Sequence, residues 1–195
     1  MSFALSLPRR ATARILGGLV AACALAGAAH AGTVYSHVQP GAQVSFQATQ
    51  MGVAMKGHFA KVEARVQFAP QQLQRSHVEV AVQAASIDAG SAQTNALLQG
   101  VDWLDAKAFA QARFVSSGFT AAGPGRYWVS GDFSVRGHTH KLRVLVTTHA
   151  VGAALAMDAH FTLDRSSYGL GAGSWADTGV VAAAIPVHVH LLVAP

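Results

Sequence analysis

The chain has 195 residues, a mean hydropathy of +0.31 and a formal net charge of +5, from 14 Lys and Arg against 9 Asp and Glu. Three of the basic residues (Arg9, Arg10 and Arg14) lie in the first 31 residues, so the rest of the chain has 11 basic residues against 9 acidic ones, a net charge of +2. This charge forms no basic cluster of the kind that binds nucleic acid, and we exclude nucleic acid as a partner.

The first 31 residues have the order of a secretory signal peptide. Three arginines precede an apolar run from Ile15 to Ala29, and Ala29-His30-Ala31 is a small-x-small cleavage site. The run is about 15 residues long, whereas a transmembrane helix needs roughly 20. We therefore expect residues 1–31 to be removed, leaving a periplasmic domain of residues 32–195 that begins at Gly32.

The single cysteine, Cys23, lies inside this N-terminal segment. Residues 32–195 therefore have no thiol for a disulfide or for a thiolate metal site. Val20-Ala21-Ala22-Cys23 also resembles a lipobox, the sequence at which lipoproteins are cut and acylated. Val20 stands where a lipobox prefers Leu, which favours a free periplasmic protein. The alternative is a lipoprotein anchored through Cys23.

From Val44 onward the dominant pattern is a two-residue alternation of apolar and other side chains, which predicts β-strands. In residues 62–68, Val62, Ala64 and Val66 share one face with Phe68, while charged or polar residues share the other. Gly, Pro and Ser turns separate the alternating segments. These segments are 44–50, 62–68, 78–84, 113–119, 127–135, 142–146, 155–163 and 185–193.

About eight strands with one apolar face each predict an all-β fold. Such strands can close into an antiparallel barrel, which removes exposed edges and leaves room for side chains or for one small ligand. A β-sandwich would show the same alternation, so the pattern alone leaves both architectures open.

The alternation stops between residues 86 and 112. Apolar residues recur there at roughly helical spacing, which predicts one or two short helices across a barrel mouth. We expect Leu98, Trp103 and Phe109 to face inward from this cap. A cap at this place either gates the entry of a ligand or completes the core.

Short segments along nearly the whole of residues 32–195 carry a family resemblance. They are Val44-Ser45-Phe46, Met55-Lys56-Gly57-His58-Phe59, Ala85-Ser86-Ile87-Asp88, Asp102-Trp103-Leu104-Asp105 with Phe109, the residues 112–117, the residues 131–139, the residues 164–171 and Trp175-Ala176-Asp177-Thr178. In this order they resemble the YceI-like family, bacterial lipocalin-like polyisoprenoid-binding proteins. The chain departs from the family pattern at Thr94-Asn95, at Ala110 and in His138-Thr139-His140-Lys141, which lie in the cap and in one turn.

The resemblance implies an eight-stranded lipocalin-like barrel whose apolar tunnel holds an isoprenoid, a quinone tail or a similar long amphiphile, with no cofactor and no catalytic residue. A tunnel binds such a chain by removing apolar area from water, worth about 25 cal/mol per Å². The alternative is that the same side chains fill a solid core. The candidate lipid-binding residues are Phe46, Phe59, Val66, Phe68, Val80, Trp103, Phe114, Phe133 and Phe161.

Nine of the ten histidines follow residue 31. His138 and His140, like His188 and His190, stand two residues apart, a spacing that places both imidazoles on one face of a strand and can chelate a metal ion. His188 and His190 alternate with apolar residues, so we expect them to face outward and to be dispensable for lipid binding. No carboxylate stands near them in the sequence, and we assign no metal site.

Two other functions remain open at this point. One is an accessory protein that presents a quinone to a membrane-protein partner of a redox chain. The other is a hydrolase with a dispersed catalytic site, although the sequence shows no nucleophile elbow, phosphate loop or metalloprotease helix. The sequence sets no oligomeric state.

Overall fold

The computed structural model describes residues 32–195. The predicted signal peptide, its cleavage site and Cys23 lie outside the described residues and stay predictions. Within residues 32–195 no helix is long and apolar enough to cross a membrane.

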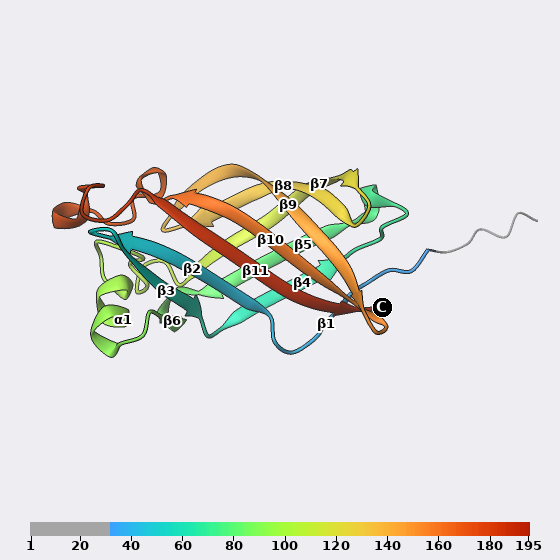
Figure 1. The fold of residues 1–195 in the computed structure, drawn as a ribbon, viewed down its shortest axis with the longest axis horizontal. Coiled ribbons are helices and arrows are strands. Elements are labelled where there is room, and N and C mark those ends of the chain that lie inside the picture. The colour runs from blue at the N-terminus through green and yellow to red at the C-terminus, as the bar shows by residue number, and fades with distance from the viewer. Residues whose placement is uncertain (1–31) are drawn as a thin grey trace, which may run out of the picture. The chain divides into compact units, whose positions relative to one another are not determined.

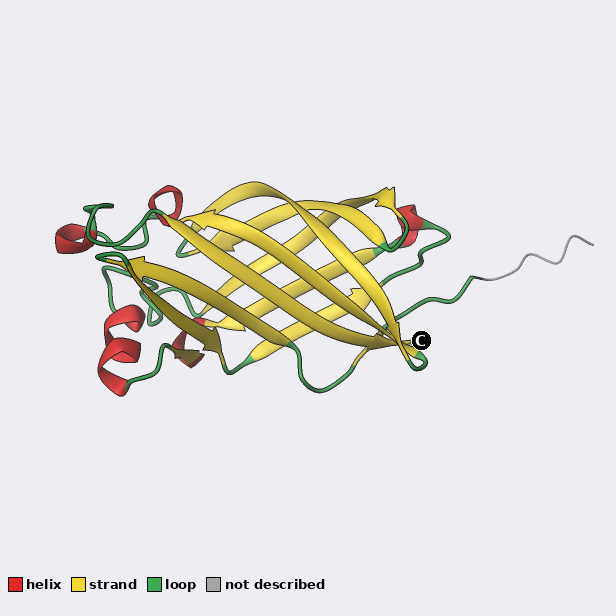
Figure 2. Ribbon diagram, in the orientation of Figure 1, coloured by secondary structure: helices red, strands yellow, loops and turns green. Residues whose placement is uncertain are grey.

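The described chain is built almost entirely of β-strands (Figures 1 and 2). The strands are β1 (His37–Val38), β2 (Gln43–Gln50), β3 (Val53–Phe59), β4 (Val62–Gln67), β5 (His77–Gln83), β6 (Ile87–Asp88), β7 (Gln111–Gly123), β8 (Arg126–Val135), β9 (His138–Val151), β10 (Ala154–Asp164) and β11 (Ala184–Ala194). The single α-helix is α1 (Ala92–Gln99), and short 3-10 turns occur at Leu73–Arg75, Ala84–Ser86, Arg165–Tyr168 and Gly173–Trp175.

The strands form one antiparallel sheet that curls into a barrel, as Figure 2 shows. The strand order is β4-β5-β7-β8-β9-β10-β11-β2-β3-β6, with β1 beside β11. Two short links join the ends of this sheet. At one, β6 continues from β5 through the turn Ala84–Ser86 and pairs with β3 at Phe59 and Ile87. At the other, Tyr35 and Phe68 exchange two backbone hydrogen bonds of 2.8 Å, so that the segment before β1 meets the end of β4.

This architecture confirms the prediction of an antiparallel, lipocalin-like, all-β fold with a short helical cap. The alternating segments of the sequence are found as β2, β4, β5, β7, β8, β9, β10 and β11. The structure adds β1, β3 and β6, so the strand count is eleven rather than eight. In β3 the alternation is obscured because Gly57 occupies an inward position, where the ring of its cross-strand partner Phe46 takes the space of a side chain.

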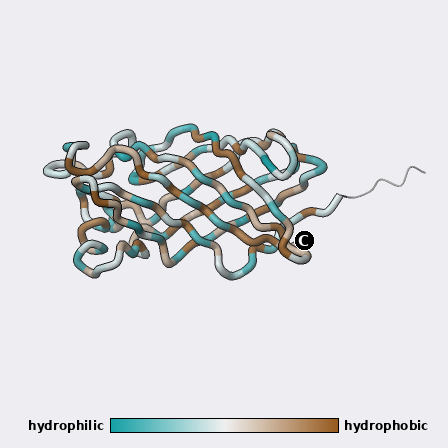
Figure 3. Tube along the Cα trace, in the orientation of Figure 1, coloured by the Kyte–Doolittle hydropathy of each residue, from teal (hydrophilic) through white to brown (hydrophobic). Residues whose placement is uncertain are grey.

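The apolar faces of the strands meet inside the barrel, and hydrophobic and hydrophilic residues alternate along the strands in Figure 3. One core cluster lies at the capped end and includes Val82, Trp103, Leu104, Tyr168 and Leu170. A second cluster lies toward the other end and includes Val66, Phe68, Val129, Val146 and Val193. The interior is therefore apolar along the whole length of the barrel.

The cap differs from the prediction at one residue. Leu98 and Trp103 line the interior, but Phe109 is 37% exposed and does not. The chain turns sharply at Asp105, which has φ of 46°, and the Phe109 N–H donates to the Asp105 carbonyl oxygen at 2.8 Å. Phe109 is thereby carried past the mouth to cover Gly137, whose Cβ would lie 2.8 Å from Phe109 Cε1.

We predict that Gly131→Ala destabilises the barrel by about 1–3 kcal/mol, the usual range for overpacking. An added Cβ would meet the Val115 carbonyl oxygen and would lie 2.6 Å from Phe114 Cζ, on the strand that pairs with β8. Gly118→Ala is the matched control, because nothing lies within 4 Å of its Cβ position. The check is the urea midpoint of each variant; equal midpoints for the two variants would contradict the prediction.

Candidate functional site

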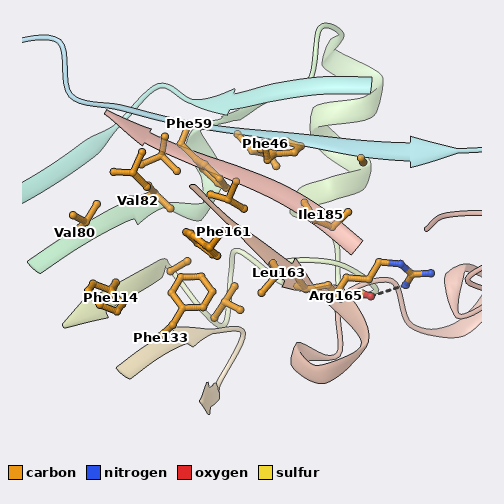
Figure 4. A pocket seen from close by; sticks show the side chains of 18 of the residues that line it. Phe46, Phe59, Val80, Val82, Phe114, Phe133, Phe161, Leu163, Arg165 and Ile185 are labelled. Atoms are coloured by element: carbon orange, nitrogen blue, oxygen red, sulfur yellow. Dashed lines mark hydrogen bonds between the residues drawn. The ribbon is translucent and has the colours of Figure 1, made fainter. Parts of the chain in front are cut away.

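The barrel encloses an apolar cavity of about 240 Å³. Inward-facing residues of the long strands form its wall, and α1, the loop after it and the segment 165–181 close one end. Figure 4 shows aromatic rings and aliphatic side chains surrounding this space. Apart from the tryptophan indoles, the polar or charged side chains that line it are Gln50, Lys56, Thr94 and Arg165.

Most of the candidate lipid-binding residues line this cavity. Phe133 lies among other aromatic rings, with its centroid 5.8 Å from that of Phe161 and 5.4 Å from that of Tyr168. A second aromatic pair, with centroids 5.9 Å apart, is formed by Phe46 and Phe59. The candidate residues in the wall are Phe46, Phe59, Val80, Trp103, Phe114, Phe133 and Phe161.

Val66 and Phe68 do not line the cavity. They belong to the second core cluster, toward the uncapped end, where Phe68 is 1% exposed. The Phe68 ring packs edge-on against the Tyr127 ring, with the centroids 5.0 Å apart. It lies tilted against the Phe119 ring, with the centroids 6.0 Å apart. Alternation correctly predicts that such residues face inward, but it does not show which inward positions border empty space.

The cap is held to the barrel by a few polar contacts. Ser91 is the N-cap of α1, and its hydroxyl accepts a hydrogen bond from the Thr94 N–H at 3.1 Å. The Asn95 side chain accepts from the Ala89 N–H at 2.7 Å and donates to Asp88 of β6 at 3.3 Å. Asn95, where the chain departs from the family pattern, therefore ties the helix to β6, while Thr94, at another departure, takes part in the N-terminal cap of the helix.

Arg165 is the residue of the site to which sequence reasoning assigned no role. It is 1% exposed, lines the cavity and lies 5.6 Å from the centre of the Trp103 ring. Its guanidinium donates at 2.8–3.3 Å to the carbonyl oxygens of Leu170, Gly171, Trp175, Asp177, Val181 and Ala182. The sequence signal that could have found it is the two-residue alternation, because Arg165 stands two residues after Leu163 and four after Phe161, on the same inward face.

Trp103, at the same end, carries a buried polar group without a partner. Among the buried side-chain nitrogen and oxygen atoms of residues 32–195, Trp103 Nε1 is the one that makes no hydrogen bond. An unpaired buried donor costs about 1–3 kcal/mol. The capped end of the cavity therefore holds one fully satisfied cation and one unsatisfied donor.

His188 and His190 face outward, as their positions in β11 predict. The structure brings them to Asp158 of β10, whose Oδ1 lies 3.0 Å from His188 Nε2 and 2.8 Å from His190 Nδ1. Burial alone would raise the pKa of Asp158, but the hydrogen bonds from the two histidines outweigh it and lower that pKa. Within the described chain, no group of three or more His, Cys, Asp or Glu is arranged to hold a metal ion.

A second hollow, of about 440 Å³, lies in the barrel wall beside these histidines. The pairing of β2 with β11 ends at Phe46 and Val187, and the next residue of β11, Pro186, has no N–H to extend it. The two strands diverge from there in Figure 1. They are tied again near the cap, where Gln50 pairs with Val181 and the Ala182 N–H donates to the Thr49 carbonyl oxygen at 2.9 Å. We call this bounded gap the side window.

The side window adjoins the apolar cavity and shares part of its lining. From the outer surface it is lined by Ser45, Gln47, Lys56, His160, Thr162, Pro186 and His188, and from the inside by Phe46, Gly57, Phe161 and Val187. Phe46, Lys56, Phe161 and Val187 line both hollows. The imidazoles of His160 and His188 stack at its edge, with centroids 4.1 Å apart and planes 2° from parallel.

Comparison with known proteins places this geometry in a family. Residues 35–193 match the family model described as "YceI-like domain". A "UPF0312 protein" of Shewanella denitrificans is 29% identical over 112 residues, and one of Vibrio cholerae is 26% identical over 113 residues. Each match covers 57% of this chain, and it covers 58% of the Shewanella protein and 59% of the Vibrio protein.

Solved structures share the fold. The crystal structure of Burkholderia cenocepacia BcnA is 35% identical, with a TM-score of 0.75 over 77% of this chain and 95% of that chain. A structure described as a polyisoprenoid binding domain from Saccharophagus degradans, implicated in plant cell wall breakdown, is 12% identical. Its TM-score is 0.63 over 83% of this chain and 98% of that chain, so it supports the fold alone.

We predict that Arg165→Met lowers the free energy of unfolding by about 3 kcal/mol or more, because it leaves several buried carbonyl oxygens without donors. Arg165→Lys should recover only part of this loss, since an ammonium group has three donors in a different geometry. Arg143→Met is the control: its guanidinium lies 4.5 Å above the Trp128 ring on the exposed outer face. Urea titration checks this prediction, and similar midpoints for Arg165→Met and Arg143→Met would contradict it.

We also predict that Asp158 makes the fold acid-sensitive. Its pKa is lowered in the folded protein, so its contacts stabilise the fold above the ordinary Asp pKa and are lost as the pH falls through the folded value. The wild type should therefore lose stability relative to Asp158→Asn as the pH is lowered from about 5 to about 2. Urea midpoints of both proteins across this range decide it. Parallel curves would show that the histidine contacts contribute nothing to stability.

Proposed function

Because the chain belongs to the YceI-like family, whose model matches residues 35–193, we propose that it is a binding protein that holds an isoprenoid, a quinone tail or a similar long amphiphile in its barrel. The observation that carries this proposal is the apolar cavity of about 240 Å³ inside the barrel. The Saccharophagus structure, described as a polyisoprenoid binding domain, has the same fold, and we propose the same class of ligand for this chain.

The energetics of an empty apolar space favour a hydrocarbon ligand. A barrel of about eight strands can be filled by its own side chains, yet this one keeps a void between rings such as Phe114, Phe133 and Phe161. Side chains that border a void lose dispersion contacts on one side. Water molecules in this void would stabilise the protein little, because they would find few hydrogen-bond partners. A flexible apolar chain restores the contacts and removes its own surface from water.

The wall of the cavity supports binding rather than catalysis. No serine, cysteine, histidine, aspartate or glutamate is among its lining residues in the described chain. Arg165 is occupied by backbone carbonyls, so its role is to support the loop above the cavity. We further propose that the protein works in the periplasm after removal of residues 1–31, on the strength of the basic, apolar and small residues in that order.

We predict that Phe133→Ala has a ligand-dependent cost. In a solid core this change costs about 3–5 kcal/mol. In the wall of a ligand-filled cavity the ring packs partly against the ligand, so the loss should be smaller in the free protein and should grow when farnesol is bound. The measurement is the urea midpoint of wild type and variant, each with and without farnesol.

Phe68→Ala is the matched control for this experiment. Phe68 is 1% exposed in the second core cluster and does not border the cavity. We expect its loss to be about 3–5 kcal/mol and equal with and without farnesol. If farnesol does not stabilise the wild type and both variants lose the same amount in both states, the interior is a packed core and the proposed function is wrong.

A further inference from the structure

The side window gives the apolar cavity a second boundary with solvent besides the cap. β2 and β11 pair up to Phe46 and Val187, and the chain is tied across the gap again at Gln50 and Val181. Between these two points β2 and β11 form no hydrogen-bonded ladder. An extended chain lying in the cavity can therefore reach the outer surface through the side of the barrel.

Lys56 is the charged side chain that the window and the cavity share. By the alternation of β3 it belongs to the outer face, because its neighbours Met55 and Gly57 point inward. It nevertheless lines the inner cavity as well as the outer hollow. No hydrogen bond or ion pair engages its ammonium group within residues 32–195, so this cation stands at the junction of the apolar interior and water.

The outer rim of the window is rich in hydrogen-bond donors. It contains the Lys56 ammonium, the imidazole of His160, which stacks on that of His188, and the hydroxyls of Ser45 and Thr162. No carboxylate lines it in the described chain. The carboxylate that contacts the rim, Asp158, accepts hydrogen bonds from His188 and His190 on the outer surface. Such a rim suits a group that offers several anionic oxygen acceptors.

The two ends of the cavity are unsuited to an anionic group. Toward the uncapped end the cavity is bounded by apolar residues of the second core cluster, among them Val129 and Val146, and Phe68 and Val193 of the same cluster are 1% and 0% exposed. At the capped end the donors of Arg165 are taken up by backbone carbonyls, and what remains there is the indole N–H of Trp103, a donor without a positive charge. A charged headgroup buried at either end would lose its hydration without gaining a partner of opposite charge.

We propose that the side window is the headgroup site of the bound amphiphile and that this headgroup is anionic, a phosphate or a carboxylate. The apolar chain lies in the cavity, passes through the wall beyond the last paired residues, Phe46 and Val187, and leaves its anionic oxygens against Lys56 and His160. This inference rests on the proposed function, since it assigns the polar end of the ligand that the cavity holds.

The test compares two probes with the same chain, farnesol and farnesyl monophosphate, by titration calorimetry. We expect the wild type to bind the phosphate at least about tenfold more tightly than the alcohol. The double variant Lys56→Gln with His160→Gln should bring the two affinities to within about twofold, chiefly by weakening the binding of the phosphate. Lys61→Gln, a lysine of the outer face that lines neither hollow, is the control and should keep the wild-type ratio.

Each other outcome overturns a defined part of the argument. Equal affinities in the wild type, or an undiminished preference for the phosphate in the double variant, would overturn the headgroup site and leave the proposed function standing. A double variant that folds but no longer binds farnesol would show that the window holds the chain itself, and would also overturn it. Binding of neither probe to the wild type would instead refute the proposed function.

Discussion

The capped end of the barrel depends on one buried guanidinium. A full positive charge inside an apolar wall is costly unless every donor finds an acceptor. Arg165 meets this requirement through backbone carbonyl oxygens from Leu170 to Ala182, and it thereby fixes the path of an irregular segment that has no strand ladder of its own. That segment supplies Trp175 and Val181 to the cavity wall. Because the cap is held by a polar network, it does not need to fill the cavity to be stable.

Along the strands, too, the contacts that stabilise the wall do not require the cavity to be filled. Glycines stand at inward positions where a ring from the next strand lies against the backbone: Phe46 over Gly57 and Phe114 over Gly131. These rings pack against the wall itself, so they need not meet across the centre of the barrel. A cavity survives because at two places these rings fill space beside the backbone rather than at the centre of the barrel, while Phe68 and Val193 toward the uncapped end are almost fully buried.

Local pattern was enough to predict eight strands of the described chain, their inward faces and the position of the helical cap, because alternation and burial have the same period. It failed where contacts between segments far apart in the sequence determine the surroundings of a side chain. Asp158 meets His188 and His190 only because β10 pairs with β11 in one register. Phe109 turned outward because Asp105 adopts a positive φ. Val66 and Phe68 have the same pattern as Val80, yet only Val80 borders the cavity, since empty space is a property of the closed barrel.

The cap segment and the side window also differ in how many hydrogen bonds must break for a ligand to pass. Moving the segment 170–182 aside would separate Arg165 from the carbonyls of several residues at once and would expose an uncompensated charge to the apolar interior. Between Phe46 and Gln50 of β2 the ladder to β11 is already missing, so side chains alone close the wall there. Rotamer changes are fast and break no backbone hydrogen bond. Passage through the side of the barrel would therefore break fewer hydrogen bonds than displacement of the segment 170–182.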